Sequence, residues 1–149
     1  MEPELELYEV SEEVALAAQI GPDAIPFIAG QGFRGIICSR FDGEEEGQPD
    51  FPSVEQAAAA YGIKTAYHPV LQPPLPISNE EAFAFGDILE TLPKPVLAYC
   101  RTGSRVAILW ALSEARRRPF KEVVLAAMGA GYDLTSLTSR FQQLYKPPQ

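Results

Sequence analysis

The segment from Val96 to Ala115 constrains the fold more strongly than any other part of the sequence. Its first four residues, 96–99, are apolar and predict a short strand that is buried on both faces of a sheet. Residues 106–115 are apolar on nearly every side, so they predict a helix in the middle of the domain. A loop of six residues, from Cys100 to Arg105, joins the two. A buried strand that leads into a buried helix is a unit of α/β architecture, and the rest of the chain must complete it.

Weaker signals on both sides of this segment predict further strands and helices in alternation. Apolar runs predict strands at residues 35–39 and 63–68, and residues 7–20 predict one or two short strands that form a hairpin at a sheet edge. Helical spacing, caps and stop signals predict helices at 24–31, 54–61, 78–92, 120–129 and 133–144. Two of these helices begin with the spacing of a capping box, Ser53 with Gln56 and Ser78 with Glu81.

This alternation predicts an α/β domain in which a largely parallel sheet is flanked by helices. Four prolines between residues 69 and 77 predict an extended connection rather than a helix. The length of 149 residues fits a single domain, residues 1–149. Ligands of open parallel sheets bind at the carboxyl ends of the strands, where the loop after Tyr99 is expected to lie.

Charge and cysteine content exclude several classes of function. The formal net charge of −8 argues against nucleic acid or an anionic membrane as the main partner. The two cysteines and single histidine, His68, predict neither a disulfide scaffold nor a zinc site, so we expect no metal and no cofactor. An acidic N-terminus and the lack of a long apolar run predict a cytoplasmic protein without a membrane segment.

The loop after Tyr99 has the composition of an anion-binding nucleophile loop. Cys100 is the predicted nucleophile, because loop amides, a helix N-terminus and nearby cations stabilise a thiolate. Gly103 allows the backbone amides to point inward, and Arg105 at the start of the helix is expected to hold an anion. Substrate contacts are also predicted for the other side chains of the loop, Arg101, Thr102 and Ser104.

Each remaining candidate has both a structural and a functional interpretation. Cys38 lies within an apolar strand, which favours packing over a redox role. His68 precedes a proline at a strand end and is more simply a hydrogen-bonded structural residue than a general base. The acidic segment from Asp42 to Glu46 is a solvated loop, unless Arg40, Asp42 or Glu44 reaches over the pocket from the neighbouring strand end.

Two resemblances follow from these motifs. The run Cys100-Arg101-Thr102-Gly103-Ser104-Arg105 resembles the active-site loop of single-domain rhodaneses, and residues 8–141 resemble the bacterial beta-lactamase hydrolase-like protein, phosphatase-like domain family. The matching segments are Ala18-Gln19-Ile20, Pro22-Asp23, Arg40 with the run from Asp42 to Pro49, His68-Pro69-Val70, the run from Pro95 to Cys100, and Gly131-Tyr132-Asp133-Leu134. The second resemblance implies a tyrosine-phosphatase-like fold. It also implies a link to metallo-beta-lactamase-like or sulfide-oxidising partner proteins, and hence to sulfur metabolism.

Two departures from tyrosine phosphatases favour sulfur chemistry. Such enzymes have five residues between cysteine and arginine, whereas four residues separate Cys100 from Arg105, and Val106 occupies the position of the phosphatase arginine. Their general acid usually follows the strand that here ends in His68-Pro69-Val70, where this chain has Leu71 and Gln72. Loss of a general acid costs about 10²- to 10⁴-fold. Sulfur transfer does not need such an acid, because its leaving groups are stable anions.

We therefore expect a rhodanese-type sulfurtransferase that carries sulfane sulfur as a Cys100 persulfide, with thiosulfate or a thiol persulfide as donor. One alternative is a phosphatase that acts through a phosphocysteine, with Asp42 or Glu44 as the acid. A second alternative is a non-catalytic module that binds an anion or a persulfide. All three predict a small anionic sulfur or phosphorus ligand at Cys100 and Arg105.

Overall fold

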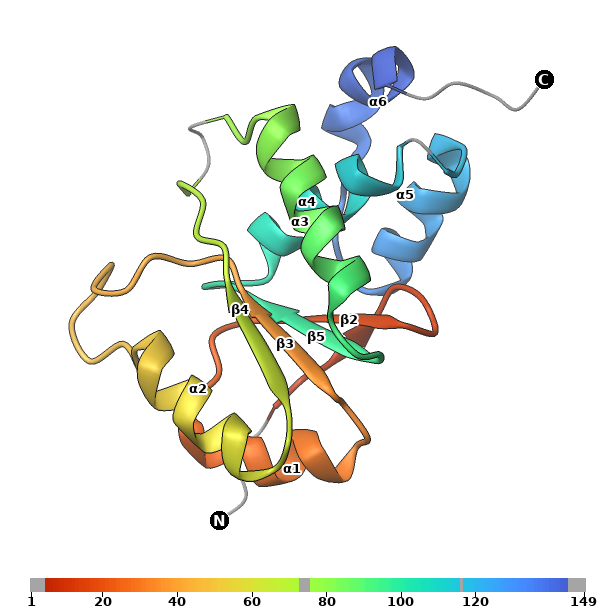
Figure 1. Ribbon diagram of the computed structural model, residues 1–149. Helices are drawn as coiled ribbons and strands as arrows, with labels where there is room; N and C mark the ends of the chain where they lie inside the picture. The colour runs from red at the N-terminus through yellow and green to blue at the C-terminus, as the bar shows by residue number, and fades with distance from the viewer. Residues whose placement is uncertain (1–4, 73–75, 116, 145–149) are drawn as a thin grey trace.

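Five strands form one mixed sheet in the computed structural model, which describes residues 5–72, 76–115 and 117–144 (Figure 1). The strand order is β1-β2-β5-β3-β4, and every neighbouring pair is parallel except β1 with β2. The strands are β1 (Tyr8–Glu9), β2 (Val14–Ala17), β3 (Gly35–Cys38), β4 (Lys64–Tyr67) and β5 (Val96–Tyr99). The prediction of a largely parallel α/β sheet is confirmed, as is the edge hairpin between residues 7 and 20.

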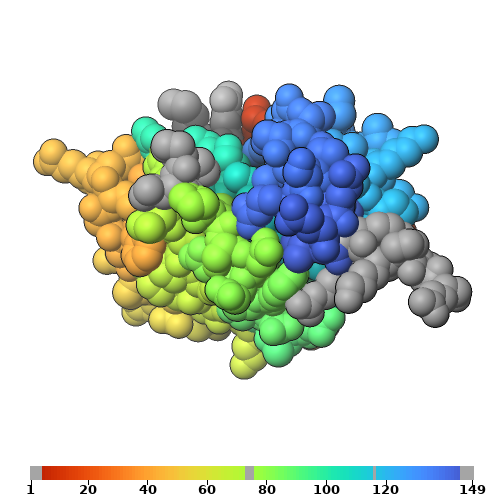
Figure 2. Space-filling view, turned by 90° about the horizontal axis from the view of Figure 1, so that it is seen from above, coloured from red at the N-terminus to blue at the C-terminus, as the bar shows by residue number. Residues whose placement is uncertain are grey.

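Helices cover both faces of this sheet. They are η1 (Pro22–Ala24), α1 (Ile25–Gly30), α2 (Phe51–Ala60), α3 (Asn79–Thr91), α4 (Ser104–Glu114), α5 (Phe120–Gly129), η2 (Thr135–Leu137) and α6 (Thr138–Leu144). Figure 1 shows α1 and α2 on one face and α3 to α6 on the other. On the second face, Arg140 of α6 donates to the Ile77 carbonyl and to Asn79 Oδ1, and the blue α6 accordingly lies against the green α3 in Figure 2.

The central strand β5 divides the core into two apolar clusters. Leu97 and Tyr99 pack in the cluster with α1 and α2, whereas Val96, Ala98 and Cys100 pack in the cluster with α3 and α4. All four residues of β5 are buried, as predicted for a strand covered on both faces. The alternation of side chains along β5 therefore directs Cys100 towards the face that carries α4.

Two helix starts differ from the sequence predictions. The α2 helix begins at Phe51, because Asp50 rather than Ser53 is its cap and the Asp50 carboxylate accepts the Ser53 amide at 2.9 Å. Pro52, which lacks a backbone N–H, is tolerated there because an N–H in the first turn would have no intrahelical acceptor. The α4 helix begins at Ser104, two residues before the predicted start, so Arg105 lies in its first turn.

The other predicted connections are largely as expected. The capping box of Ser78 and Glu81 is confirmed, with both reciprocal hydrogen bonds present. Asp133 Oδ1 accepts the Thr135 amide at 3.0 Å, but the N-cap of η2, which precedes α6, is Leu134 rather than Asp133. Residues 69–72 and 76–78 are neither helix nor strand, and the prediction for 73–75 lies outside the described residues.

Candidate active site

Cys100 directly follows the central strand of the sheet and is fully buried. The Cys100 amide donates to the Ala17 carbonyl of β2 at 3.4 Å, and the Arg101 carbonyl accepts the Gln19 amide at 3.1 Å. On the other side, the Tyr99 carbonyl accepts the Ser39 amide at 2.9 Å. The start of the loop is therefore fixed by hydrogen bonds to segments on both sides.

Gly103 turns the loop back towards the sulfur. Its φ of 92° is a left-handed conformation that suits glycine, and its amide donates to Cys100 Sγ at 3.2 Å. The Tyr132 hydroxyl lies directly against Gly103, where a Cβ would overlap it, and donates to the Thr102 carbonyl at 3.4 Å. Burial raises the pKa of Tyr132 to about 12, with the charge of Cys100 contributing. The predicted inward-facing amide of Gly103 is thus present, and Tyr132 closes the loop from outside.

Arg105 is 2% exposed and makes a two-pronged ion pair with Glu44. Its Nη1 donates to Glu44 Oε2 at 2.7 Å, and its Nη2 donates to Glu44 Oε1 at 2.6 Å. The same two nitrogens also donate to the Val70 carbonyl and to Gln72 Oε1, each at 3.1 Å. Planar guanidinium and carboxylate groups match in this arrangement, so the Arg105 side chain has one well-defined orientation.

Glu44 also joins Arg105 to a second buried arginine. Arg40, which is 1% exposed, donates through Nε to Glu44 Oε1 at 2.8 Å and through Nη1 to Gln19 Oε1 at 2.9 Å. The Arg105 guanidinium, and then Arg40, hold the pKa of the Glu44 carboxyl at about 2, although burial opposes this shift. Two buried cations and one carboxylate thus form a network beside the loop.

The remaining loop side chains face a small pocket. Arg101 is 47% exposed, and its Nη2 lies 3.8 Å from Glu45 Oε2, while the Thr102 hydroxyl donates to Ser104 Oγ at 3.0 Å. A pocket of about 140 Å³ is lined by Gln72, Arg101, Thr102, Ser104 and Arg105. Two arginines and two hydroxyls around one small pocket suit an anion.

The two predicted acids, Glu44 and Asp42, have different surroundings. Glu44 is brought to the site as expected, but with a pKa of about 2 it is ionised at neutral pH and cannot serve as a proton donor. The Asp42 carboxylate accepts the Phe51 amide at 2.8 Å, and the Asp42 amide donates to the Tyr67 hydroxyl. Asp42 therefore connects its loop to the start of α2.

Cys38 and His68 have structural contacts. Cys38 packs in the cluster with α1 and α2, on the opposite face of the sheet from Cys100, and its thiol donates to the Arg40 carbonyl at 3.3 Å. Burial raises the pKa of the Cys38 thiol. His68 Nε2 lies 2.9 Å from the Glu81 carbonyl oxygen, so that nitrogen carries a proton and ties β4 to α3.

Sequence reasoning missed three residues at the site. Gln19 and Glu45 each accept a hydrogen bond from Arg40, and Tyr132 lies against Gly103. Their positions in the sequence show no spacing that links them to Cys100, because the contacts arise only when the sheet and α5 assemble. Gln19, Glu45 and Tyr132 all fall within the short segments that carry the family resemblance.

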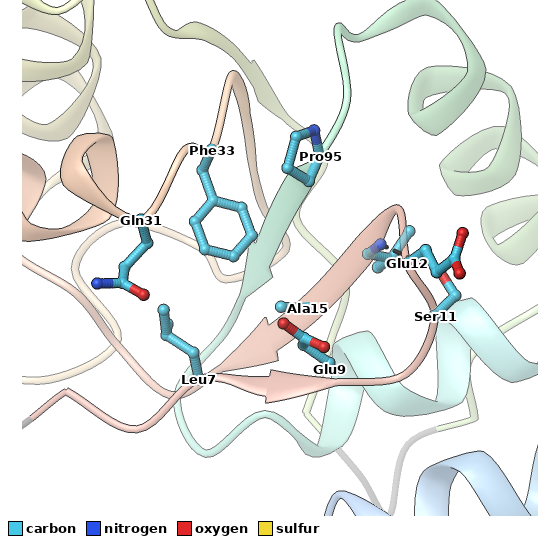
Figure 3. Close-up of a pocket in the computed structure, with 9 residues that line it drawn as sticks. Leu7, Glu9, Ser11, Glu12, Ala15, Gln31, Phe33 and Pro95 are labelled. Carbon is cyan, nitrogen blue, oxygen red and sulfur yellow. Dashed lines mark hydrogen bonds between the residues drawn. The ribbon is translucent and has the colours of Figure 1, made fainter.

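A second pocket lies at the opposite end of the sheet (Figure 3). It has a volume of about 210 Å³ and lies around the amino end of β2, where Glu9, Glu12 and Phe33 line it. Two carboxylates at this pocket repel anions, so the smaller pocket at the Cys100 loop suits an anion better. Within residues 5–72, 76–115 and 117–144, no group of three or more His, Cys, Asp or Glu side chains could hold a metal ion. In the same ranges, every helix is too short or too polar to cross a bilayer.

The sheet order, the cysteine after its central strand and the buried arginine in the following helix define a tyrosine-phosphatase-like protein. A candidate phosphatase from Neisseria meningitidis is 31% identical, with a TM-score of 0.80 over 92% of this chain and 96% of that one. Two more distant structures share the fold. One is Tk-PTP, with a TM-score of 0.71 and 15% identity over 92% of this chain and 93% of that one. The other is the core catalytic domain of the PP-IP phosphatase Siw14 from S. cerevisiae, with a TM-score of 0.66 and 12% identity over 94% of this chain and 85% of that one.

Residues 6–117 match the family described as "Beta-lactamase hydrolase-like protein, phosphatase-like domain", and the chain belongs to this family. Beta-lactamase hydrolase-like proteins of Agrobacterium fabrum and Xylella fastidiosa (strain Temecula1) are 32% and 31% identical over 87% of the chain. The chain spans only 30% of the length of each of these relatives.

These comparisons overturn the prediction of a sulfurtransferase. The family description and the three structures named above all refer to phosphatases. The prediction relied on the short spacing between Cys100 and Arg105. In the structure, Arg105 lies in the first turn of α4 beside the pocket, so one residue fewer in the loop still leaves an arginine there.

Proposed function

We propose that this chain is a phosphatase-like hydrolase in which Cys100 attacks a phosphoryl group and forms a phosphocysteine. The observation that carries the proposal is the arrangement of the loop: the Gly103 amide points at Cys100 Sγ, and Arg105, oriented by Glu44, lines the adjacent pocket. Inward-pointing amides and a fixed guanidinium stabilise the oxygens of a phosphoryl group as charge develops on them.

The proposed reaction has two steps. In the first, the Cys100 thiolate attacks phosphorus, the S–P bond forms, and the bond to the leaving oxygen breaks with its electron pair going to that oxygen. In the second, water attacks phosphorus, the S–P bond breaks and the thiolate is regenerated. The proton of the attacking water passes to solvent, and phosphate is released.

Leaving groups of low basicity fit this site best. Residues 69–77 contain no titratable side chain, and Glu44 is held as a carboxylate. Without a proton donor at the leaving oxygen, a basic alkoxide leaves about 10²- to 10⁴-fold more slowly. Aryl and acyl phosphates, whose leaving groups are stable anions, are therefore the substrates proposed here.

Trapping the covalent intermediate tests this proposal. The protein is mixed with excess 4-nitrophenyl phosphate, quenched with acid within one turnover and analysed by intact mass. We expect the mass to increase by one phosphoryl group in the wild type and in Cys38→Ser, and to stay unchanged in Cys100→Ser. Absence of the adduct, together with absence of Cys100-dependent phosphate release, would overturn the proposal.

A further inference from the structure

The hydrogen-bond donors of Arg105 are nearly all occupied in the structure. A guanidinium has five N–H groups, two on Nη1, two on Nη2 and one on Nε. Glu44 accepts one from each Nη, the Val70 carbonyl accepts the second from Nη1, and Gln72 Oε1 accepts the second from Nη2. Within residues 5–72, 76–115 and 117–144, no acceptor faces the Nε–H. An anion that enters the pocket therefore meets a single free N–H of Arg105.

The edge of the Arg105 guanidinium that is left for a phosphoryl group is the one formed by Nε and Nη2. Glu44 fills the other edge, formed by Nη1 and Nη2. The N–H groups of Nε and Nη2 run parallel, so they can bind two oxygens of one phosphoryl group. Gln72 Oε1 accepts the Nη2 donor at 3.1 Å. Two-pronged binding of a phosphoryl group by Arg105 therefore requires the Gln72 oxygen to leave Nη2.

Of the three acceptors on this guanidinium, Gln72 is the one that an anion displaces at least cost. Glu44 is charged and also accepts from Arg40, so its position is held from two sides. The Val70 carbonyl belongs to a buried residue whose amide donates to the Ser39 carbonyl at 3.3 Å. Gln72 is neutral, exposed and lines the anion pocket, so rotation of its side chain is enough to release it. A charged oxygen binds a guanidinium more strongly than the oxygen of an amide.

We propose that the Gln72 amide oxygen competes with the bound anion for Nη2 of Arg105 and thereby sets the affinity of the pocket. The proposal rests on the proposed function in taking a phosphoryl group as the ligand. In the free protein Gln72 completes the hydrogen bonding of a cation that is 2% exposed, and a phosphoryl group replaces it on binding. Because the competition acts on substrate and product alike, Gln72 also favours the release of phosphate.

Removing the amide oxygen without shortening the side chain tests the competition. Gln72→Met keeps an unbranched side chain but offers Nη2 only a weak acceptor, whereas Gln72→Glu offers a charged one. Leu71→Met, at the neighbouring exposed position, is the control. Calorimetric titration with inorganic phosphate measures Kd without turnover. We expect Gln72→Met to bind phosphate about 2- to 12-fold more tightly than wild type, the range for one hydrogen bond. Gln72→Glu should bind phosphate more weakly than wild type, and Leu71→Met should match it.

Unchanged or weaker phosphate binding by Gln72→Met would overturn the proposal, and weaker binding would instead make Gln72 a donor to the anion. Wild type that binds no phosphate would overturn it as well. As a second readout, the inhibition constant of phosphate against 4-nitrophenyl phosphate should follow the same order among the variants. The proposed function is judged separately, because the titration involves no covalent step: a protein that binds phosphate as expected but lacks Cys100-dependent turnover would overturn that function alone.

Discussion

Cys38 and Cys100 lie near the same ends of two neighbouring strands and are both buried, yet they face opposite sides of the sheet and have different hydrogen-bond partners. Cys38 is the last residue of β3 and pairs in register with Tyr99, among side chains that pack on α1 and α2. Cys100 lies one position further along, on the other face, and accepts the Gly103 amide. The comparison teaches that a shift of one residue at a strand end separates a cysteine that packs in the core from the proposed nucleophile.

Replacing each cysteine by serine should separate the two roles most strongly. Cys100→Ser removes the nucleophile, so we expect kcat for 4-nitrophenyl phosphate to fall by about 10⁵-fold or more, as for other covalent catalysts. Cys38→Ser should keep kcat within about threefold and act on stability alone, by about 1–3 kcal/mol for a buried hydroxyl. Steady-state kinetics and urea unfolding of both variants provide the measurement. Comparable losses of kcat would show that Cys38 takes part in the chemistry.

Glu44→Gln should produce the next largest effect, and this effect is on stability. Arg40 and Arg105 are both buried, and Glu44→Gln removes their shared carboxylate. Arg40 then keeps Glu45, whereas Arg105 keeps the neutral Val70 carbonyl and Gln72, so we expect a cost of about 3 kcal/mol. Glu46→Gln, in an exposed part of the same loop, serves as the control. Urea unfolding at neutral pH measures the free energy of unfolding of both variants. Equal values would show that the contacts of Glu44 with Arg40 and Arg105 do not stabilise the fold.

The same carboxylate gives the protein a defined acid sensitivity. The pKa of Glu44 is about 2 in the folded protein, against an ordinary value of 4.5. Its contribution to stability is therefore fully present above 4.5 and is lost as the pH falls towards about 2. The stability difference between wild type and Glu44→Gln should shrink over that interval. A difference that does not vary with pH would contradict the ion pair.

Arg105→Lys tests whether the region around Cys100 needs a planar, two-pronged cation. Lysine keeps the charge but cannot match a carboxylate and a phosphoryl group at two points, so we expect kcat to fall by about 10²- to 10³-fold. Arg101→Lys, at a 47% exposed position, should change mainly KM. Kinetics with 4-nitrophenyl phosphate distinguish the two, and equal effects on kcat would remove the special role of Arg105.

Gly103→Ala should lower activity less than the changes above. Comparison with Gly62→Ala distinguishes the effect of a changed Cys100 loop from that of backbone strain alone. Both Gly103 and Gly62 have positive φ angles, 92° and 73°, so alanine costs each position about 1–2 kcal/mol of stability. Only at Gly103 does the added Cβ meet a neighbour, the Tyr132 hydroxyl, whereas nothing lies near Gly62. Activity should therefore fall in Gly103→Ala and persist in Gly62→Ala. Equal activities would indicate that the Gly103 amide is not needed at Cys100 Sγ.

Local signals in the sequence predicted most of the fold. Three of these features depend only on residues that are close in the sequence, so they can be recognised from it directly. They are the apolar run of β5, the capping box at Ser78 and the proline-rich connection. The start of α2 was predicted three residues late, because Asp50 and Ser53 both have side chains that can cap a helix and the pattern does not rank them.

The site was predictable only where its residues are contiguous. Cys100, Gly103 and Arg105 lie in one loop, and their roles follow from residue type and spacing. Glu44 comes from the loop after β3, and its two-pronged contact with Arg105 depends on the register between β3 and β5. That contact lowers the pKa of the Glu44 carboxyl to about 2, so this candidate acid is ionised at neutral pH. Gln19 lies in the connection after β2, far from Arg40 in the sequence, so its hydrogen bond to Arg40 also forms only when the sheet assembles.

The alternation of side chains along β5 limits where insertions and deletions can occur in this family. Because successive strand residues face opposite sides, adding or deleting one residue within β5 would exchange the environments of Tyr99 and Cys100. The thiol would then enter the cluster with α1 and α2, and a tyrosine would occupy the base of the anion loop. Insertions and deletions should therefore be excluded from the four residues before Cys100, whatever apolar residues fill them.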